Sequence, residues 1–388
     1  MQRFCSIFSQ LLQLFPRLEF QQLVQQHRAE RHARGFECWT QFVAMLFCQL
    51  GRAHSLREIC GGLASCLGKL SHLGIERAPV RSTLAYANEH RPAGLYRDLF
   101  FALLERCRRV AGRHKFRFKN KLVSLDATVI DLCAEIFDWA KFRRTKGAVK
   151  LHLLLDHDGY LPCFAVITPG KVHEINVARR LRFAPGTILV MDRGYLDYRW
   201  LDELTAQGVY FVTRLKDGAV IEEAAPGPIP KGSPIQSDQI IALPGSGRSF
   251  NPERVLRRVV VVVPKTGQEL VLLTNQFTFS PVTIAALYRE RWQIELLFKA
   301  LKQNLKIKTF VGTSANALHI QIWTALIAML ILKYLQLKSR WGWSLSNLVA
   351  LLRMNLFVHR DLWAWLDQPF TPPPEPGDAP QQTSWAFA

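Results

Sequence analysis

The sequence predicts an α/β fold, in which a mixed sheet with a β-rich insertion follows an all-helical N-terminal segment. Three observations lead to this prediction. Residues 1 to about 115 consist of helix-forming runs. From residue 121 the hydrophobic period becomes two, which is typical of strands, and strand-like runs then alternate with helical ones. Turn-rich segments and a hairpin interrupt that alternation between 217 and 276.

The first 115 residues contain two long runs that predict helices, at 39–50 and 95–110. Ser55 and Glu58 of "SLRE" form a capping box at which the next helix begins. We expect Gly61 and Gly62 to interrupt that helix, and a second short helix to begin at Ser82.

This helix–turn–helix pattern is compatible with a module that reads a DNA groove. Its polar candidates are Arg81, Asn88, His90 and Arg91. It is equally compatible with a helical domain whose charged side chains face water. The net charge favours the first interpretation, so we predict a helical DNA-binding domain over 1–115.

The chain is strongly basic, with 50 Lys and Arg against 31 Asp and Glu, a formal net charge of +19. Such an excess favours a polyanionic partner, nucleic acid first and an anionic membrane surface second. The segment 106–121 interleaves cations with Phe116 and Phe118, which suits a phosphate backbone but also a solvated linker.

The eight cysteines contain no C-x-x-C pair, which argues against zinc ribbons and a disulfide framework and favours a reducing cytoplasm. The N-terminus lacks the uninterrupted apolar core of a signal peptide. The apolar run 322–332 is too short to cross a bilayer, and Gln321 and Lys333 bracket it. We therefore expect a buried helix, no membrane association and a cytoplasmic protein.

The α/β part is predicted over 116–366. Strands are expected at 121–132, at 150–168 as two strands around an Asp158–Gly159 turn, at 187–192 and at 209–216, with helices at 173–183 and 197–208. The insertion 217–276 ends in a hairpin that turns at 265–267. Helices follow at 287–307, 316–337 and 344–356, so that C-terminal helices occupy 303–366, and the Pro-rich tail 367–388 is expected to be disordered.

The predicted helix 287–307 has a polar edge about 60° wide beside an apolar stripe. This edge consists of Tyr288, Arg291, Glu295 and Lys302. One interpretation is a solvated face with i,i+4 pairs, Arg291 with Glu295 and Glu295 with Lys299. The other is a functional edge, and two aspartates elsewhere favour it.

Asp126 shares a face of the first strand with Leu122 and Ser124, where an unpaired carboxylate would be unfavourable. Asp192 ends the buried strand 187–192, and ligands gather at the carboxyl ends of strands in open sheets. If the two strands are neighbours, both carboxylates lie close together, and Glu295 can supply a third. Taken singly, each aspartate is better explained as a strand-end or capping carboxylate.

Other acidic and imidazole side chains are weaker candidates. Asp131 points to the opposite face of the first strand, and the turn at 156–159 accounts for Asp156 and Asp158. His152 and His173 could be ligands, although a lone histidine more often packs or faces solvent.

Three converging carboxylates repel one another unless a cation lies between them. Two Mg²⁺ ions would remove that repulsion, and Mn²⁺ may take their place, because oxygen donors favour these metals over zinc. Such a pair activates a water or a 3′-hydroxyl for in-line attack on a phosphodiester.

The pattern Y-x2-R-x3-E-x6-K at residues 288–302 resembles the signature of one group of bacterial DDE transposases, the insertion-sequence-four-like enzymes. "LDATVIDL" and "MDRGYLD" are similar to the first and second aspartate segments of that group. "FVTRLK" resembles the strand before its β-rich insertion, and the helical front resembles a domain often joined to these enzymes.

The resemblance implies a ribonuclease-H-like core and a Mg²⁺-dependent triad of Asp126, Asp192 and Glu295. It implies DNA contacts by six side chains: Tyr288, Arg291, Lys302, Arg193, Arg214 and Lys216. Family members commonly cleave through a DNA hairpin with a flipped base stacked on an aromatic side chain, and "QELVLLTN" contains no Trp for that role.

The implied function is cut-and-paste transposition, namely metal-dependent strand cleavage and strand transfer at the inverted repeats of the protein's own insertion sequence. The implied partners are transposon ends and target DNA, with a homodimer in the synaptic complex at the bacterial nucleoid. The alternatives are a hydrolytic nuclease on the same fold and a DNA-binding protein without catalysis.

Overall fold

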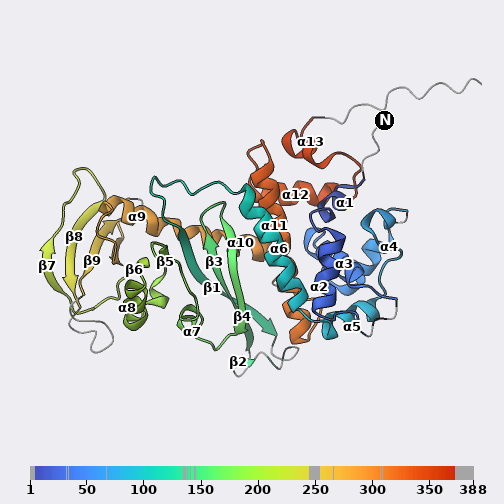
Figure 1. Ribbon diagram of the computed structural model, residues 1–388, viewed down its shortest axis with the longest axis horizontal. Helices are drawn as coiled ribbons and strands as arrows, with labels where there is room; N and C mark the ends of the chain where they lie inside the picture. The colour runs from blue at the N-terminus through green and yellow to red at the C-terminus, as the bar shows by residue number, and fades with distance from the viewer. Residues whose placement is uncertain are drawn as a thin grey trace, which may run out of the picture.

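The computed structural model describes residues 5–371, except 32, 34, 67, 134–136, 138, 140, 144–145, 244–253, 265, 306 and 308. The molecule is elongated, with helices at one end and a long sheet at the other (Figure 1). The expected disordered tail lies mostly outside the described residues, which end at Thr371.

The N-terminal part is helical, as predicted. Its helices are α1 (Ile7–Leu12), α2 (Arg17–Gln26), α3 (Cys38–Leu50), α4 (Leu56–Ala64), α5 (Arg81–His90) and α6 (Gly94–Val110), with a 3₁₀ turn η1 at Ser71–Leu73. The capping box is confirmed, because the Ser55 side chain accepts from the Glu58 N–H and the Glu58 carboxylate accepts from the His54 N–H.

The predicted interruption at Gly61 and Gly62 is wrong, since α4 continues through both residues. Gly62 lies against the ring of Phe47, and a Cβ at Gly62 would come within 2.9 Å of that ring. The glycine therefore permits close packing of α4 on α3 and does not end the helix.

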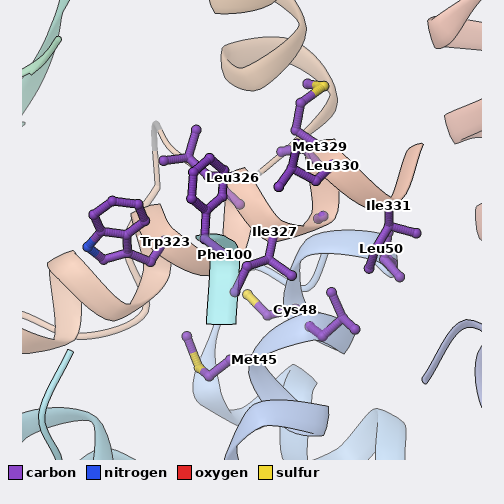
Figure 2. Close-up of a cluster of buried hydrophobic side chains, with 14 of the residues drawn as sticks. Met45, Cys48, Leu50, Phe100, Trp323, Leu326, Ile327, Met329, Leu330 and Ile331 are labelled. Carbon is purple, nitrogen blue, oxygen red and sulfur yellow. The ribbon is translucent and has the colours of Figure 1, made fainter. Parts of the chain in front are cut away.

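The C-terminal helices α11 (Ala315–Lys338), α12 (Leu345–Asn355) and α13 (Leu362–Asp367) complete this helical body. Helix α11 runs through its centre, and Figure 2 shows Leu326, Ile327 and Ile331 meeting side chains of α3 and α6. Its 24 residues are long and apolar enough to cross a membrane. The prediction that the apolar run 322–332 is too short for this is therefore wrong, because the helix extends beyond the run on both sides. The expectation of a buried helix is confirmed, since 83% of its most apolar window is buried.

The sheet has ten strands in the order β2-β3-β1-β5-β6-β10-β9-β8-β7, with β4 also paired to β3. Their bounds are β1 (Leu122–Cys133), β2 (Lys141–Arg143), β3 (Lys146–Asp156), β4 (Leu161–Pro169), β5 (Ile188–Met191), β6 (Tyr210–Arg214), β7 (Glu222–Pro226), β8 (Ile235–Ala242), β9 (Leu256–Val262) and β10 (Glu269–Thr274). Strands β1, β3 and β4 pair antiparallel, whereas β5 and β6 run parallel to β1. This mixed order is the predicted ribonuclease-H-like sheet, and the insertion strands β7–β10 extend it beyond β6.

Helices cover both faces of the sheet. Helices α7 (Glu174–Ala178) and α8 (Tyr198–Ala206) pack on one face, and α7 is shorter than the predicted helix 173–183. Helix α9 (Pro281–Glu290) packs on the other face, and α10 (Trp292–Asn304) continues past β1 into the helical body. The predicted single helix 287–307 is therefore wrong, because it is two helices that meet at Arg291.

Candidate active site

Asp126 and Asp192 lie side by side on neighbouring parallel strands. The β1–β5 register pairs Leu125 with Met191, and the two aspartates are the next residues on each strand. Leu122 and Ile188, which alternate in step with them, face α9, so the aspartates lie on that same face. The predicted adjacency of the two strands is confirmed.

The local backbone holds Asp192 in place. Its carboxylate accepts from the Gly194 N–H at 2.8 Å and caps the short 3₁₀ helix η3 (Arg193–Tyr195). Its carbonyl accepts from the Thr213 hydroxyl of β6 at 3.0 Å. The aspartate is thus fixed from two sides at the carboxyl end of β5.

Arg291 joins the helix to the aspartates. It lies at the junction of α9 and α10, where its N–H bonds to the Tyr288 carbonyl and its carbonyl accepts from Ile294 N–H, both at 3.1 Å. One guanidinium nitrogen is 2.6 Å from the Glu295 carboxylate, and another is 3.6 Å from that of Asp126. The i,i+4 pair exists, but it is part of a bridge to the sheet and not of a solvated face.

Asp126 reports the electrostatics of this cluster. The pKa of its carboxyl is raised to about 7, chiefly by burial and also by the carboxylates of Asp192 and Glu295, while the Ala127 N–H and Arg291 lower it. Three carboxylates thus lie close to one bridging guanidinium.

The donor set suits a hard divalent cation, since it offers carboxylate oxygens with no thiol or imidazole in the cluster. Within the described part of the chain, no three His, Cys, Asp or Glu side chains lie close enough to hold a metal ion as they stand. At this site the Arg291 guanidinium contacts both Asp126 and Glu295. A protein cation thus bridges two of the three carboxylates.

The other predicted DNA contacts lie around this cluster. Tyr288 is buried under the sheet, and the charges nearest its hydroxyl are Arg291, Arg214 and Asp192. Lys302 donates to the Val129 carbonyl of β1 at 2.9 Å, two turns beyond Glu295 on α10. Arg193 pairs with Asp217 at 2.8 Å, and Lys216 is exposed beside that pair.

A cavity of about 580 Å³ adjoins Tyr288, Arg214 and Arg291, between α9 and the insertion strands β9 and β10. Trp292 lines it and is 56% exposed. The sequence interpretation missed Trp292, although a large aromatic directly after Arg291 on a polar edge was a usable signal.

Two candidates for groove reading are structural instead. Asn88 is buried and bonds to Gln41 at 2.8 Å, and its carbonyl accepts from Asn316 of α11. Arg91 is also buried and donates to Gln41 and to the Phe36 carbonyl. Both interpretations as groove-reading residues are therefore wrong, whereas Arg81 and His90 are exposed.

The weaker candidates also find structural partners or lie on the surface. His152 is fully buried and bonds to Thr168 at 2.9 Å, and burial lowers its pKa to about 4. Asp131 is exposed, as is His173 at the start of α7. Asp156 pairs with Lys121 at 2.6 Å and accepts from the Asp158 N–H.

Comparison with known families identifies the family to which the chain belongs. The family described as "Transposase DDE domain" matches residues 117–331, which include Asp126, Asp192 and Glu295. The chain belongs to the DDE transposase family. A second family, described only as a domain of unknown function, matches residues 5–76 of the helical part of this transposase.

Relatives along most of the chain are transposases as well. The putative transposase y4zB of Sinorhizobium fredii is 31% identical over 80% of this chain and 87% of its own. The probable transposase for insertion sequence element IS5377 of Geobacillus stearothermophilus is 30% identical, over 68% of this chain and 70% of its own. A chain of a piggyBac transposase synaptic complex with hairpin DNA gives a TM-score of 0.45 at 11% identity, over 99% of this chain and 91% of its own.

Two general properties of this transposase follow from its family. It is a DNA-processing enzyme, and its chemistry depends on a divalent metal. The residues that would hold the metal and DNA come from the geometry described above.

Proposed function

We propose that this transposase cleaves DNA at the terminal inverted repeats of its own insertion sequence and joins the freed 3′ ends to target DNA. The observation that supports this most directly is that Arg291 joins Asp126 and Glu295, and that Asp192 lies beside Asp126, although the three carboxylates are far apart in the chain. Two transposases, one of them from an insertion sequence element, match most of the chain at 30–31% identity, which supports DNA transposition as the reaction.

Asp126, Asp192 and Glu295 are the residues that would hold two Mg²⁺ ions, for which Mn²⁺ may substitute. Bound there, the metals supply an activated water or 3′-hydroxyl and stabilise the departing oxygen. The carboxylates fit that role in donor chemistry and in their excess negative charge.

Arg291 prepares the site before DNA arrives. Its guanidinium neutralises Asp126 and Glu295 in the DNA-free protein. A phosphate of the transposon end competes for the same guanidinium, because Arg binds phosphate in a bidentate manner. DNA binding thereby releases the two carboxylates, and Tyr288, Arg214 and Lys302 stand beside them to position the phosphate backbone. Arg193 and Lys216 extend this basic rim.

Trp292 supplies an aromatic surface for an unstacked base of the DNA end. It is exposed beside a cavity large enough for a base, next to Arg214 and Arg291. Trp292→Ala should lose about 1–3 kcal/mol of end binding. The check is fluorescence of 2-aminopurine at the terminal position, with Trp363→Ala, an exposed tryptophan of α13, as control. Equal 2-aminopurine signals in both variants would exclude this role.

The catalytic assignment is tested with a labelled duplex that carries the inverted repeat. Asp126→Asn, Asp192→Asn and Glu295→Gln should each abolish Mg²⁺-dependent cleavage and leave end binding nearly intact. Asp131→Asn is the matched control, because it changes an exposed carboxylate of the same strand. Full cleavage by any of the three variants would remove that residue from the triad.

The same assay separates the alternatives. A hydrolytic nuclease would cut without joining 3′ ends to a target plasmid, and a catalytically silent DNA-binding protein would do neither. The proposed synaptic complex contains a homodimer, since two ends must meet, and it works at the bacterial nucleoid. We also propose that 1–115 contributes DNA binding through exposed residues such as Arg81 and His90.

A further inference from the structure

Two adjoining cavities meet at Tyr160 and Lys333, and one of them runs along α10. The first, of about 420 Å³, lies between the segment 112–115, the β3–β4 turn and the end of α11. The second, of about 300 Å³, continues along α10 towards α12. Tyr160 and Lys333 line both cavities, so together they form one trough, which we call the basic groove.

The basic groove is lined by cations without acids. Its cationic lining comprises Arg113, Lys115, Lys299 and Lys333. None of the described residues that line either cavity is Asp or Glu. The nearby carboxylate of Glu290 is buried and already engaged by Lys115 and by the Tyr160 hydroxyl, the latter at 3.1 Å.

Lys333 is the unusual member of this set. It extends from the central helix α11, and its ammonium lies 6.0 Å from the centre of the Tyr160 ring. Burial lowers the pKa of Lys333, and no carboxylate among the described residues pairs with it. A partly buried ammonium without a carboxylate partner is unfavourable, and an anion bound in the groove would relieve that penalty.

The groove and the catalytic edge lie on different sides of α10. Gln293, Leu296 and Ala300 line the groove, whereas Glu295 and Lys302 face β1. At about 100° per residue, these three groove residues lie about 100–160° from Glu295 around the helix axis, and Lys299 forms the near rim at about 40°. A ligand held on the Gln293 side of the groove is therefore distinct from the phosphates held beside Asp126.

We propose that the basic groove binds the phosphodiester backbone of a DNA segment other than the one at the catalytic edge. This deepens the proposed function and rests on it. Lysine, arginine and the amides of Gln293 and Gln303 can all donate to phosphate oxygens, and such contacts position DNA without reading its sequence.

The test is the salt dependence of DNA binding by the full chain. The probes are a random-sequence 30-bp duplex and a duplex that carries the inverted repeat. The double variant Arg113→Ala/Lys299→Ala changes two exposed side chains, and Lys333→Met removes the charge of a partly buried one. The double variant should lower the slope of log K against log salt by about 2 on at least one duplex, and Lys333→Met by about 1.

Arg199→Ala is the matched control, since Arg199 is 74% exposed on α8, away from the groove. A double-variant slope equal to that of the control on both duplexes would overturn the proposal. Lys333→Met changes a partly buried side chain. If the Lys333→Met variant does not fold, the slope of the double variant alone decides the proposal.

Two further measurements identify the source of the bound DNA. Loss of end cleavage in the double variant assigns the groove to the element's own flank, and loss of joining with pre-cleaved ends assigns it to target DNA. Glu295→Gln should keep the full binding slope. If Glu295→Gln still cleaves, the proposed catalytic triad is wrong. The salt slope of the Arg113→Ala/Lys299→Ala variant would still show whether the basic groove binds DNA.

Discussion

His157 is a buried imidazole that lies between the Ser124 hydroxyl at 2.7 Å and the Glu290 carboxylate at 3.9 Å. Burial lowers its pKa to about 4, in spite of Glu290, which raises it. Between pH 6.5 and 4 the unfolded chain therefore binds a proton that the folded chain does not, and folding stability falls as the pH falls.

We expect His157 alone to remove about 2 kcal/mol of stability between pH 7.5 and pH 5. His157→Gln should lose less stability over that interval, since glutamine does not titrate but still bonds to Ser124. Urea unfolding midpoints at the two pH values measure this. If the wild type and the variant lose the same stability between pH 7.5 and pH 5, His157 is already protonated in the folded protein.

Single residues show how far the pattern of a sequence reaches. Asp126 and Asp192 were predicted because strand alternation and strand ends are local properties, and the structure places them together. The contact between Arg291 and Asp126 was not predicted, because it depends on the junction of two helices at Arg291. The hydrophobic pattern of the sequence runs through this junction without a break and so indicates one helix.

At the scale of elements, α4 contains a matched pair of glycines. A Cβ at Gly61 meets nothing within 4 Å, whereas a Cβ at Gly62 meets the Phe47 ring at 2.9 Å. Gly61→Ala should stabilise the protein by about 0.5–1 kcal/mol, as expected for a helix interior. Gly62→Ala should destabilise it, because α4 must move away from α3. Thermal unfolding of the two variants decides, and an equal gain in both would contradict the close packing.

The insertion is held by a buried ion pair between β8 and β9. Arg257 binds both carboxylate oxygens of Asp238, at 2.7 and 2.8 Å, and donates to the Phe279 carbonyl ahead of α9. Asp238→Ala leaves the guanidinium buried and unpaired, which should destabilise the protein by about 3–5 kcal/mol.

The exposed pair Arg199–Glu203 of α8 provides the comparison for Asp238→Ala. Glu203→Ala should cost less than about 1 kcal/mol. Guanidinium unfolding compares the two, and similar small losses would mean that the β8–β9 pair does not stabilise the insertion.

Elements with strong local signals were predicted from the sequence: the capped helix α4, the strands β1 and β5, and the β9–β10 hairpin. Elements whose limits depend on distant partners were not. The side chain of Asn88 in α5 points inward, where it accepts from Gln41, which is 47 residues away in the chain.

For the whole molecule, the shared helical core matters most. Helix α11 follows the sheet in the chain but packs among α3 and α6, which precede it (Figure 2). The division at residues 115 and 116 stays a prediction about function, and the packing shows that the helices on both sides share one core.

We therefore expect that a fragment over 116–371 does not fold alone, because α11 would expose its apolar surface. Circular dichroism and gel filtration of the fragment, with and without a co-expressed 1–115 fragment, test this. A monomeric, cooperatively unfolding 116–371 fragment would contradict the shared core.

The central claim is that Asp126, Asp192 and Glu295 bind divalent metal together when DNA displaces Arg291. The most direct measurement is Mn²⁺ binding, followed by electron paramagnetic resonance, to the full chain in complex with an inverted-repeat duplex. We predict tight Mn²⁺ binding by the wild-type complex, and loss of bound ion in each of Asp126→Asn, Asp192→Asn and Glu295→Gln. Unchanged Mn²⁺ binding in all three variants, with DNA still bound, would contradict the account.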